Sequence, residues 1–298
     1  MLVSDRISTP PETRHLYTER IVMLPHSYFV NDHRQLYPRP FAHVPTRKEH
    51  GLRERGVIYG NFGQLYKVEP KLFDVWTKIV VATPNATLWL LKFPKEAVTR
   101  LLQQASARGL GTDQMVLSSL LPIDTHVASK GLCDVALDTA MFNGHTTGAD
   151  TLWTGSPLVS MPGLQMRSRA GASMAFALGV TTFLARSLDD YQQIAQHLGR
   201  SRRHLQRARR RLETAINTSP LFDTALWAKG FERSWFQMWD TFVATGSVDS
   251  MHVLTSDDAL HLYGLDWESP SLMQGTTSRR RAGGVVHDPL GLSRPSSS

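Results

Sequence analysis

Residues 86–93 read Ala-Thr-Leu-Trp-Leu-Leu-Lys-Phe, and this almost uninterrupted apolar run follows the turn signal Pro84-Asn85. A strand covered on both faces of a parallel sheet needs apolar side chains in both directions, so the run predicts a central strand of such a sheet. The helical spacing of the apolar residues after Pro70 predicts a helix before it, since proline is tolerated in the first helical turn. Upstream of that helix, the β-rich residues 56–61 (GVIYGN) predict another strand. The three segments together indicate a β-α-β unit.

The same alternation of strands and helices continues along the chain. Further strands are predicted over residues 115–120, 134–138, 158–161 and 180–184. Helices are predicted over residues 95–107, 125–130, 148–154, 168–178, 189–198, 202–217 and 224–244. Short loops between strands and helices favour a doubly wound parallel sheet, so the predicted fold class is α/β and Rossmann-like. Ligands of such sheets bind in the loops after the carboxyl ends of the strands. Here those loops span residues 62–69, 121–126, 139–147 and 162–167.

The cysteine content and the apolar runs indicate the cellular compartment in which the chain is expected to function. Cys133 is the single cysteine among 298 residues, which rules out an internal disulfide and indicates a reducing compartment. Neither a signal-peptide core nor a run of about 18 apolar residues is present, so no membrane partner is expected. We therefore expect a soluble protein of the cytoplasm or nucleus. Residues 246–298 lose apolar content and are expected to form a largely disordered tail.

The formal net charge of +7 invites a nucleic-acid interpretation, because basic surfaces attract polyanions. Much of this charge lies in residues 200–211 (RSRRHLQRARRR). Apolar Leu205, Ala208 and Leu212 recur there at helical spacing, which predicts an amphipathic helix with a basic solvated face. We favour that interpretation over a nucleic-acid partner, and binding of a polyanion by this helix remains the alternative.

The predicted loop over residues 139–147 carries the clearest chemical pattern. It leads through Gly144, His145, Thr146 and Thr147 into a helix. Free backbone N–H groups, the helix dipole and two hydroxyls at such a start are suited to cradle a phosphate. The two threonines are equally consistent with ordinary N-caps. Asp150 in the first turn either accepts hydrogen bonds from a ligand hydroxyl or complements the helix dipole.

Other candidate residues are ambiguous when each is taken alone. Lys67 is either a surface lysine or a charge that neutralises a departing diphosphate. His126 is either a partly buried histidine or a stacking partner for a base. Gln64 alone does not indicate whether it binds a ligand. The sequence contains neither a Cys/His cluster with zinc spacing nor an Asp-X-Asp pair, so no metal is expected. The glycine patterns of nicotinamide and P-loop enzymes are also absent.

Taken together, several blocks of sequence are more specific than any single residue. The blocks are NFGQLYKV at 61–68, LWLLKFP at 88–94, DVALDT at 134–139, NGHTTG at 143–148, LWTGSP at 152–157, MPG at 161–163, SPLF at 219–222 and QMW at 237–239. In order and spacing, from about residue 20 to residue 242, they closely resemble the C-terminal catalytic lobe of protein O-GlcNAc transferases.

The resemblance implies a two-lobed GT-B glycosyltransferase in which this lobe binds UDP. It implies inverting transfer of N-acetylglucosamine from UDP-GlcNAc to Ser or Thr hydroxyls of intracellular proteins, with no metal or other cofactor. Lys67 would be the catalytic group that stabilises the leaving diphosphate. The site residues that it implies are Gln64, Lys67, His145, Thr146 and Thr147 for the diphosphate, Asp150 for the ribose, and His126 with the backbone of Leu121, Pro122 and Ile123 for the uracil.

Two positions depart from the family pattern. Ile123 stands where the family typically has a lysine, and Ser129 stands where an arginine is usual, with Lys130 beside it as a candidate substitute. Lost charge-assisted hydrogen bonds, worth about 1.5–3 kcal/mol each, are expected to weaken UDP binding about tenfold or more.

The resemblance also sets the expected domain organisation. Family enzymes carry helix repeats and a whole N-terminal catalytic lobe before this one, whereas residues 1–45 resemble only the end of that lobe and a linker. We expect residues 1–55 to be too short for a second sheet, residues 46–245 to form the UDP-binding lobe, and residues 246–298 to be the tail. The alternative function is a non-catalytic UDP-sugar-binding module.

Overall fold

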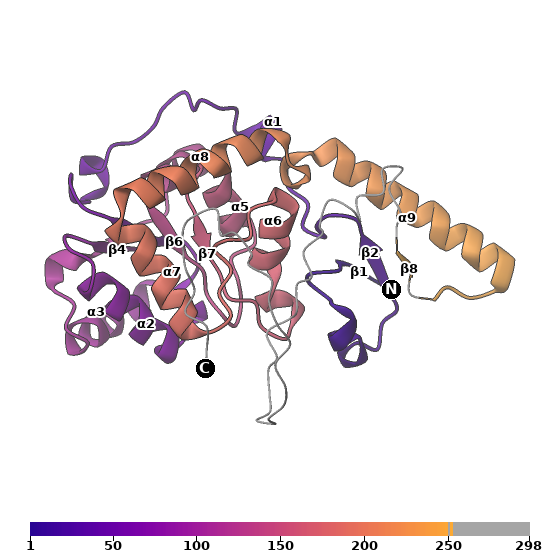
Figure 1. Ribbon diagram of the computed structural model, residues 1–298, viewed down its shortest axis with the longest axis horizontal. Helices are drawn as coiled ribbons and strands as arrows, with labels where there is room; N and C mark the ends of the chain where they lie inside the picture. The colour runs from indigo at the N-terminus through magenta and orange to yellow at the C-terminus, as the bar shows by residue number, and fades with distance from the viewer. Residues whose placement is uncertain (250, 253–298) are drawn as a thin grey trace, which may run out of the picture.

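Five parallel strands form the main sheet of the computed structural model, which describes residues 1–249, 251 and 252. The strands are β3 (Ile58–Asn61), β4 (Thr87–Leu91), β5 (Met115–Ser118), β6 (Val135–Leu137) and β7 (Leu158–Val159). Their order in the sheet is β5-β4-β3-β6-β7, so the chain starts at the centre, moves to one edge and returns to the other side of β3 (Figure 1). This is the doubly wound α/β fold that the sequence predicts.

The apolar run at residues 86–93 forms β4, between β3 and β5. All five side chains of β4 are buried, and Leu88 and Leu90 are at most 1% exposed. Leu88 pairs with Tyr59 on one side and with Met115 on the other. Burial on both faces confirms the interpretation of the run as a central strand.

Helices cover both faces of this sheet (Figure 1). They are α2 (Pro70–Val81), α3 (Val98–Ala107), α4 (Ile123–Ser129), α5 (Thr146–Trp153), α6 (Ala170–Leu178), α7 (Leu188–Arg200) and α8 (Arg202–Thr218). On one face α2 packs beside α7, and the indole N–H of Trp76 donates to the hydroxyl of Tyr191 at 3.2 Å. On the other face α5 packs beside α8. The sheet is therefore held between two helical layers.

The strand predicted over residues 180–184 is wrong. Only Leu184 bridges to Ser160, because the segment turns instead of running straight. Its bend begins at Gly179, which has a φ of 73°, and the N–H of Leu184 donates back to the carbonyl of Thr181. The pairing is therefore limited to this one bridge, in which Ser160 exchanges backbone hydrogen bonds with Phe183 and Ala185.

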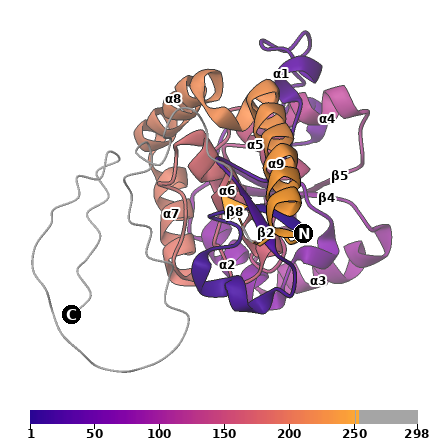
Figure 2. The ribbon, with the colours of Figure 1, turned by 90° about the vertical axis from the view of Figure 1, so that its right-hand side faces the viewer.

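A second, smaller sheet lies beside the lobe. It contains β1 (Leu2–Asp5), β2 (Ile21–Leu24) and β8 (Met251–His252), all parallel and in the order β1-β2-β8. Helix α9 (Thr224–Thr245) lies along β2, and Figures 1 and 2 show it leaving the main lobe to do so. Buried Val22 and Leu24 pack against Trp227 and Met238 of α9.

The small sheet corrects the expectation that residues 1–55 form no second sheet. Residues near both ends of the described chain combine in it, because Met251 and His252, which lie in the segment expected to be largely disordered, pair with Val22 and Met23 of β2. The remainder of the predicted tail, residue 250 and residues 253–298, lies outside the described residues. No helix in the described part of the chain is long and apolar enough to cross a bilayer.

The basic segment forms α8 as an amphipathic helix. Its buried side chains are Leu205, Ala208, Leu212 and Ile216, whereas Arg202, Arg203, Arg207 and Arg210 are exposed. The hydroxyl of Ser201 accepts a hydrogen bond from the N–H of His204 and caps the helix. This confirms the predicted basic solvated face.

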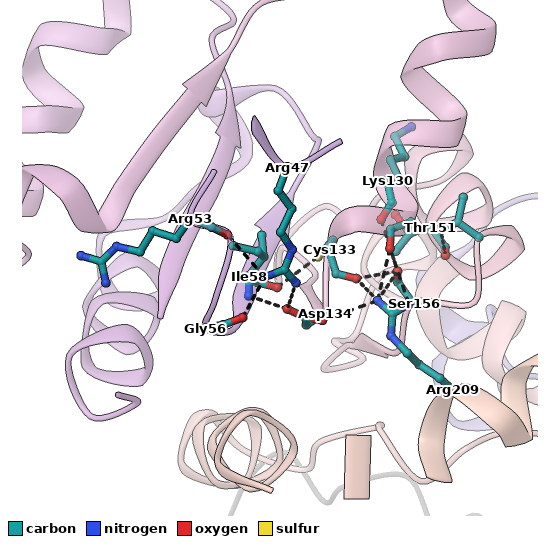
Figure 3. A network of polar contacts seen from close by, with 12 residues as sticks. Arg47, Arg53, Gly56, Ile58, Lys130, Cys133, Asp134, Thr151, Ser156 and Arg209 are labelled. Atoms are coloured by element: carbon teal, nitrogen blue, oxygen red, sulfur yellow. Dashed lines mark hydrogen bonds and ion pairs between the residues drawn. The ribbon is translucent and has the colours of Figure 1, made fainter. Parts of the chain in front are cut away.

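A polar network joins the amino ends of β3 and β6, away from the ligand edge of the sheet (Figure 3). The carboxylate of Asp134 accepts from the backbone N–H of Ile58 at 2.8 Å and from Arg47 at 2.7 Å. Arg209 of α8 turns inward, donates to the carbonyl of Cys133, and lies 4.0 Å from the second oxygen of Asp134. The network ties Arg47 and α8 to the central strands, so it stabilises the scaffold under the site.

Candidate functional site

An open pocket of about 540 Å³ lies at the carboxyl edge of the sheet. Its volume falls within the roughly 300–1,000 Å³ of small-molecule sites. The loops after β3 and β6 supply most of its lining, so the pocket lies where the strand order reverses. Its lining residues are Phe62, Gly63, Gln64, Tyr66, Lys67, Leu91, Phe93, Leu120, His126, Phe142, His145, Thr146 and Thr147.

The pocket brings together most of the residues singled out from the sequence. Six of the ten line it, and they are Gln64, Lys67, His126, His145, Thr146 and Thr147. Leu121, Pro122, Ile123 and Asp150 are not among the lining residues. Ile123 is 56% exposed at the start of α4, whereas Asp150 is only 3% exposed inside α5.

The turn before α5 is held from below by Asp138, which follows β6. One carboxylate oxygen accepts from the N–H groups of Gly144 (2.8 Å) and Thr139 (2.9 Å), and the other accepts from the hydroxyl of Ser160 (2.7 Å). A Cβ at Gly144 would lie 2.5 Å from the hydroxyl oxygen of Thr147, so the turn requires glycine there. Burial raises the pKa of Asp138 to about 6. The turn is thus formed before any ligand arrives.

Helix α5 presents its amino end to the pocket. Thr146 is its first residue, and the preceding His145 does not cap the helix with its side chain. The first N–H groups of a helix have no intrahelical acceptor, and the helix dipole favours an anion beside them. Together with the hydroxyls of Thr146 and Thr147, this end is suited to bind a phosphate.

Lys67 supplies a positive charge to the same corner of the pocket. It ends the short 3-10 helix η3 (Leu65–Lys67), and its ammonium lies 3.5 Å from the carbonyl oxygen of Asn143 and 3.9 Å from the ring centre of Phe142. Partial burial lowers the pKa of Lys67, and the nearby carboxylate of Asp138 acts in the opposite direction. The ammonium and the amino end of α5 therefore face one anion-sized region.

His126 lies at another wall of the pocket. Its ring is edge-on to Phe62, with ring centres 6.3 Å apart. Burial, and secondarily the charge of Lys130, lower the pKa of His126 to about 4. The ring is therefore neutral near pH 7 and offers an uncharged flat surface to a base.

Asp150 occupies a buried cluster behind α5. One of its oxygens lies 2.7 Å from Nε2 of His33, and the other accepts from the fully buried ammonium of Lys130. Both oxygens are engaged within the protein, so a ribose contact by Asp150 would need these partners to rearrange. Lys130 points to Asp150 and does not take the place of an arginine at the pocket. Ser129 is buried, and its hydroxyl donates to the carbonyl of His126.

Sequence reasoning missed the aromatic residues of the pocket and the buried partners behind it. Phe62 and Phe142 lie in the very loops that the fold predicts for ligands, so their position was available as a signal. Tyr28 contacts His145, and His33 contacts Asp150. Each pair is 117 residues apart in the sequence, so no local pattern predicts these contacts. In the part of the chain that the structure describes, no three potential metal ligands come together.

Residues 39–231 match the profile of the family described as glycosyl transferase family 41. The chain belongs to this family. Its lobe has the architecture of the C-terminal half of a GT-B glycosyltransferase, as the sequence predicts. A solved mutant of the O-GlcNAc transferase of Thermobaculum terrenum is 30% identical, with a TM-score of 0.66 over 79% of this chain and 45% of that chain. WaaG, a glycosyltransferase involved in lipopolysaccharide biosynthesis, shares the fold at a TM-score of 0.50 and 13% identity, over 77% of this chain and 61% of that one.

Curated relatives of this family 41 chain carry names of one activity. The probable UDP-N-acetylglucosamine–peptide N-acetylglucosaminyltransferase SEC of Arabidopsis thaliana is 37% identical over 86% of this chain and 26% of its own length. The UDP-N-acetylglucosamine–peptide N-acetylglucosaminyltransferase of Caenorhabditis elegans is 35% identical over 73% of this chain and 19% of its own length. The chain therefore spans about a quarter or less of these relatives.

Proposed function

We propose that this lobe binds the UDP part of UDP-GlcNAc, with no metal or other cofactor, and serves inverting transfer of N-acetylglucosamine to Ser or Thr hydroxyls of proteins. The observation that carries the proposal is that the Lys67 ammonium lies 3.5 Å from the carbonyl oxygen of Asn143, in the turn that leads into the amino end of α5. The names of the relatives from Arabidopsis thaliana and Caenorhabditis elegans support the choice of donor and acceptor. The single buried cysteine is consistent with work in the cytoplasm or nucleus.

In this reaction the lobe would stabilise the leaving group, which is the diphosphate of UDP. When an acceptor hydroxyl attacks the anomeric carbon from the opposite side, the bond to the phosphate oxygen breaks and the diphosphate gains negative charge, while the hydroxyl releases its proton to the diphosphate or to solvent. Lys67, the N–H groups at the start of α5 and the hydroxyls of Thr146 and Thr147 would receive that charge. Donors that are already in place cost no reorganisation when the charge develops. The neutral ring of His126 would lie against the uracil.

The alternative is a non-catalytic UDP-sugar-binding module. It is supported by the small size of the second sheet, whose three strands have four, four and two residues among those described. An acceptor hydroxyl must be held about 3–3.5 Å from the anomeric carbon, and losing that positioning forfeits several kcal/mol of barrier reduction. We therefore expect this chain by itself to bind UDP and not to glycosylate peptides.

Titration calorimetry of the chain with UDP tests the binding step. We expect a Kd in the micromolar range or weaker, and Lys67→Ala should weaken it about tenfold or more, as expected for one charge-assisted contact. Lys71→Ala removes an exposed lysine of α2 and is the matched control. Absence of binding at millimolar UDP would contradict the proposal.

Radiolabelled sugar transfer from UDP-GlcNAc to a Ser/Thr-rich peptide separates the two functions. Transfer above background that disappears in Lys67→Ala and persists in Lys71→Ala would show a self-sufficient enzyme. Binding without transfer would assign the isolated chain to the alternative.

A further inference from the structure

The segment over residues 26–37 contacts α5 (Thr146–Trp153) and the residue before it through three side-chain hydrogen bonds, one of which runs from the indole N–H of Trp153 to the carbonyl of Tyr37 at 2.9 Å. The hydroxyl of Tyr28 lies 2.8 Å from Nε2 of His145, and Nε2 of His33 lies 2.7 Å from Asp150. Neither Tyr28 nor His33 lines the pocket, so both act on it only through the residues that they hold. Tyr28 is the more informative of the two because its partner is a lining residue.

The contacts of His145 determine which ring nitrogen carries its proton. Nδ1 lies 3.1 Å from the carbonyl oxygen of Asn143, which can only accept, so Nδ1 must be the protonated nitrogen. Burial lowers the pKa of His145, the hydrogen bond to Asn143 opposes this effect, and the charge of Lys67 adds to it, so the net lowering of the pKa favours the neutral ring. Nε2 of a neutral ring protonated at Nδ1 is an acceptor. The hydroxyl of Tyr28 is therefore the donor in the contact with Nε2.

Tyr28 is itself fixed in place. Its backbone N–H donates to Asp5 at 2.8 Å, and the same carboxylate oxygen accepts from the hydroxyl of Ser173 at 2.6 Å. Burial raises the pKa of the Tyr28 hydroxyl, so the hydroxyl keeps its proton. Asp5 at the end of β1 thus anchors the backbone of Tyr28, and the side-chain hydroxyl of Tyr28 in turn contacts His145, whose Nδ1 donates to the carbonyl of Asn143.

We propose that Tyr28 is a positioning residue of the diphosphate site, which holds His145 as the neutral Nδ1–H tautomer through the hydrogen bond to Nε2. Both ring nitrogens of His145 are then used inside the protein. A diphosphate is met by the backbone N–H groups and hydroxyls of Thr146 and Thr147 and by Lys67, while the imidazole sets the shape of the turn. The role of Tyr28 in ligand binding rests on the proposed function.

The test compares Tyr28→Phe, which removes only the hydroxyl, with Tyr17→Phe. Tyr17 belongs to the same N-terminal region, and its hydroxyl accepts from the N–H of Met166 at 3.3 Å, so its loss is a matched control. The nitrogen chemical shifts of the imidazoles are recorded by NMR without nucleotide, with His145→Asn used to assign the signal. UDP affinity and melting temperature are measured on the same samples.

In the wild type and in Tyr17→Phe we expect His145 to have a protonated Nδ1 and an unprotonated Nε2. In Tyr28→Phe the Nε2 shift should move toward that of a mixture of tautomers. UDP affinity should fall about three- to tenfold in Tyr28→Phe alone, the loss expected for one neutral hydrogen bond. A protonated Nε2 in the wild type, or wild-type UDP affinity in Tyr28→Phe, would overturn the proposal. The wild-type spectrum decides the tautomer even if Tyr28→Phe does not fold.

Different measurements test the proposed function and the proposed role of Tyr28. If the wild type does not bind UDP, the proposed function is contradicted. The nitrogen shifts of His145 in the free protein do not depend on nucleotide, so they still support or overturn the hydrogen bonding that we assign to Tyr28.

Discussion

Nε2 of His33 lies 2.7 Å from a carboxylate oxygen of Asp150, and both side chains are only 4% exposed. The other oxygen of Asp150 pairs with Lys130, whose side chain is fully buried. Burial lowers the pKa of Lys130, and the carboxylate of Asp150 counters this effect. The N-terminal segment, the end of α4 and α5 are therefore joined by one buried charged cluster directly behind the candidate site.

Lys130→Met should destabilise the protein by about 3 kcal/mol, because removing one partner of a buried ion pair leaves the other charge uncompensated. The measurement is the free energy of unfolding in urea. The double variant Lys130→Met/Asp150→Asn should recover part of the loss, since no buried charge is then left unpaired. Lys71→Met at the surface of α2 is the control. A cost below about 1 kcal/mol for Lys130→Met would contradict a charged, coupled cluster.

Asp138→Asn should remove a pH dependence of stability between about pH 4 and pH 7. The folded protein holds the proton of Asp138 more tightly than the unfolded chain, because burial raises its pKa to about 6. A raised carboxyl pKa means that this group adds stability as the pH falls through 6 toward the unfolded value and withdraws it as the pH rises. Between pH 7 and pH 4, the free energy of unfolding in urea should rise by about 2 kcal/mol more in the wild type than in Asp138→Asn. Parallel stability profiles for the wild type and Asp138→Asn would contradict it.

Gly144→Ala should weaken UDP binding at least tenfold. The added Cβ would lie 2.5 Å from the hydroxyl oxygen of Thr147 and 3.2 Å from the backbone nitrogen of Gly148, so the Thr147 side chain or the start of α5 must shift. Gly131→Ala is the control, because a Cβ there meets Thr154 at an ordinary 3.6 Å. Calorimetric titration with UDP checks both variants. Equal affinities would show that the backbone of the turn is not part of the binding site.

Ile123→Lys should tighten UDP binding about three- to tenfold, as one added charge-assisted contact does when it is partly exposed to solvent. Ile123 is 56% exposed at the first residue of α4, close to the rim residue Leu120, so a lysine side chain has room to turn toward the pocket. Leu102→Lys adds the same charge at an exposed position of α3, outside the loops of the ligand edge, and should leave UDP affinity unchanged. Equal gains from both substitutions would mean a general effect of net charge and not a contact in the site.

Much of the fold and of the candidate site was predictable because the signals are local. The apolar run of β4, the helical spacing after Pro70 and the glycine-flanked start of α5 each depend on neighbours within a few residues. Such patterns reflect side-chain direction and backbone preference, which act at short range along the chain. Once the strand order of a doubly wound sheet is accepted, the loops after β3 and β6 must meet at one edge, and Lys67 and Thr146 meet there.

The sequence by itself therefore determined the α/β class and the edge of the sheet that carries the pocket, and its resemblance to the family singled out six of the lining residues. Only the tertiary structure decided which side chains surround His145 and Asp150. Tyr28 and His145, like His33 and Asp150, are 117 residues apart, and β2 pairs with β8 across more than 220 residues. Partners at such separations share no local sequence pattern. They meet because the packing of helices and strands buries their side chains next to each other. For this reason Asp150 turned out to be committed to His33 and Lys130, and Tyr28 to be the residue that holds His145.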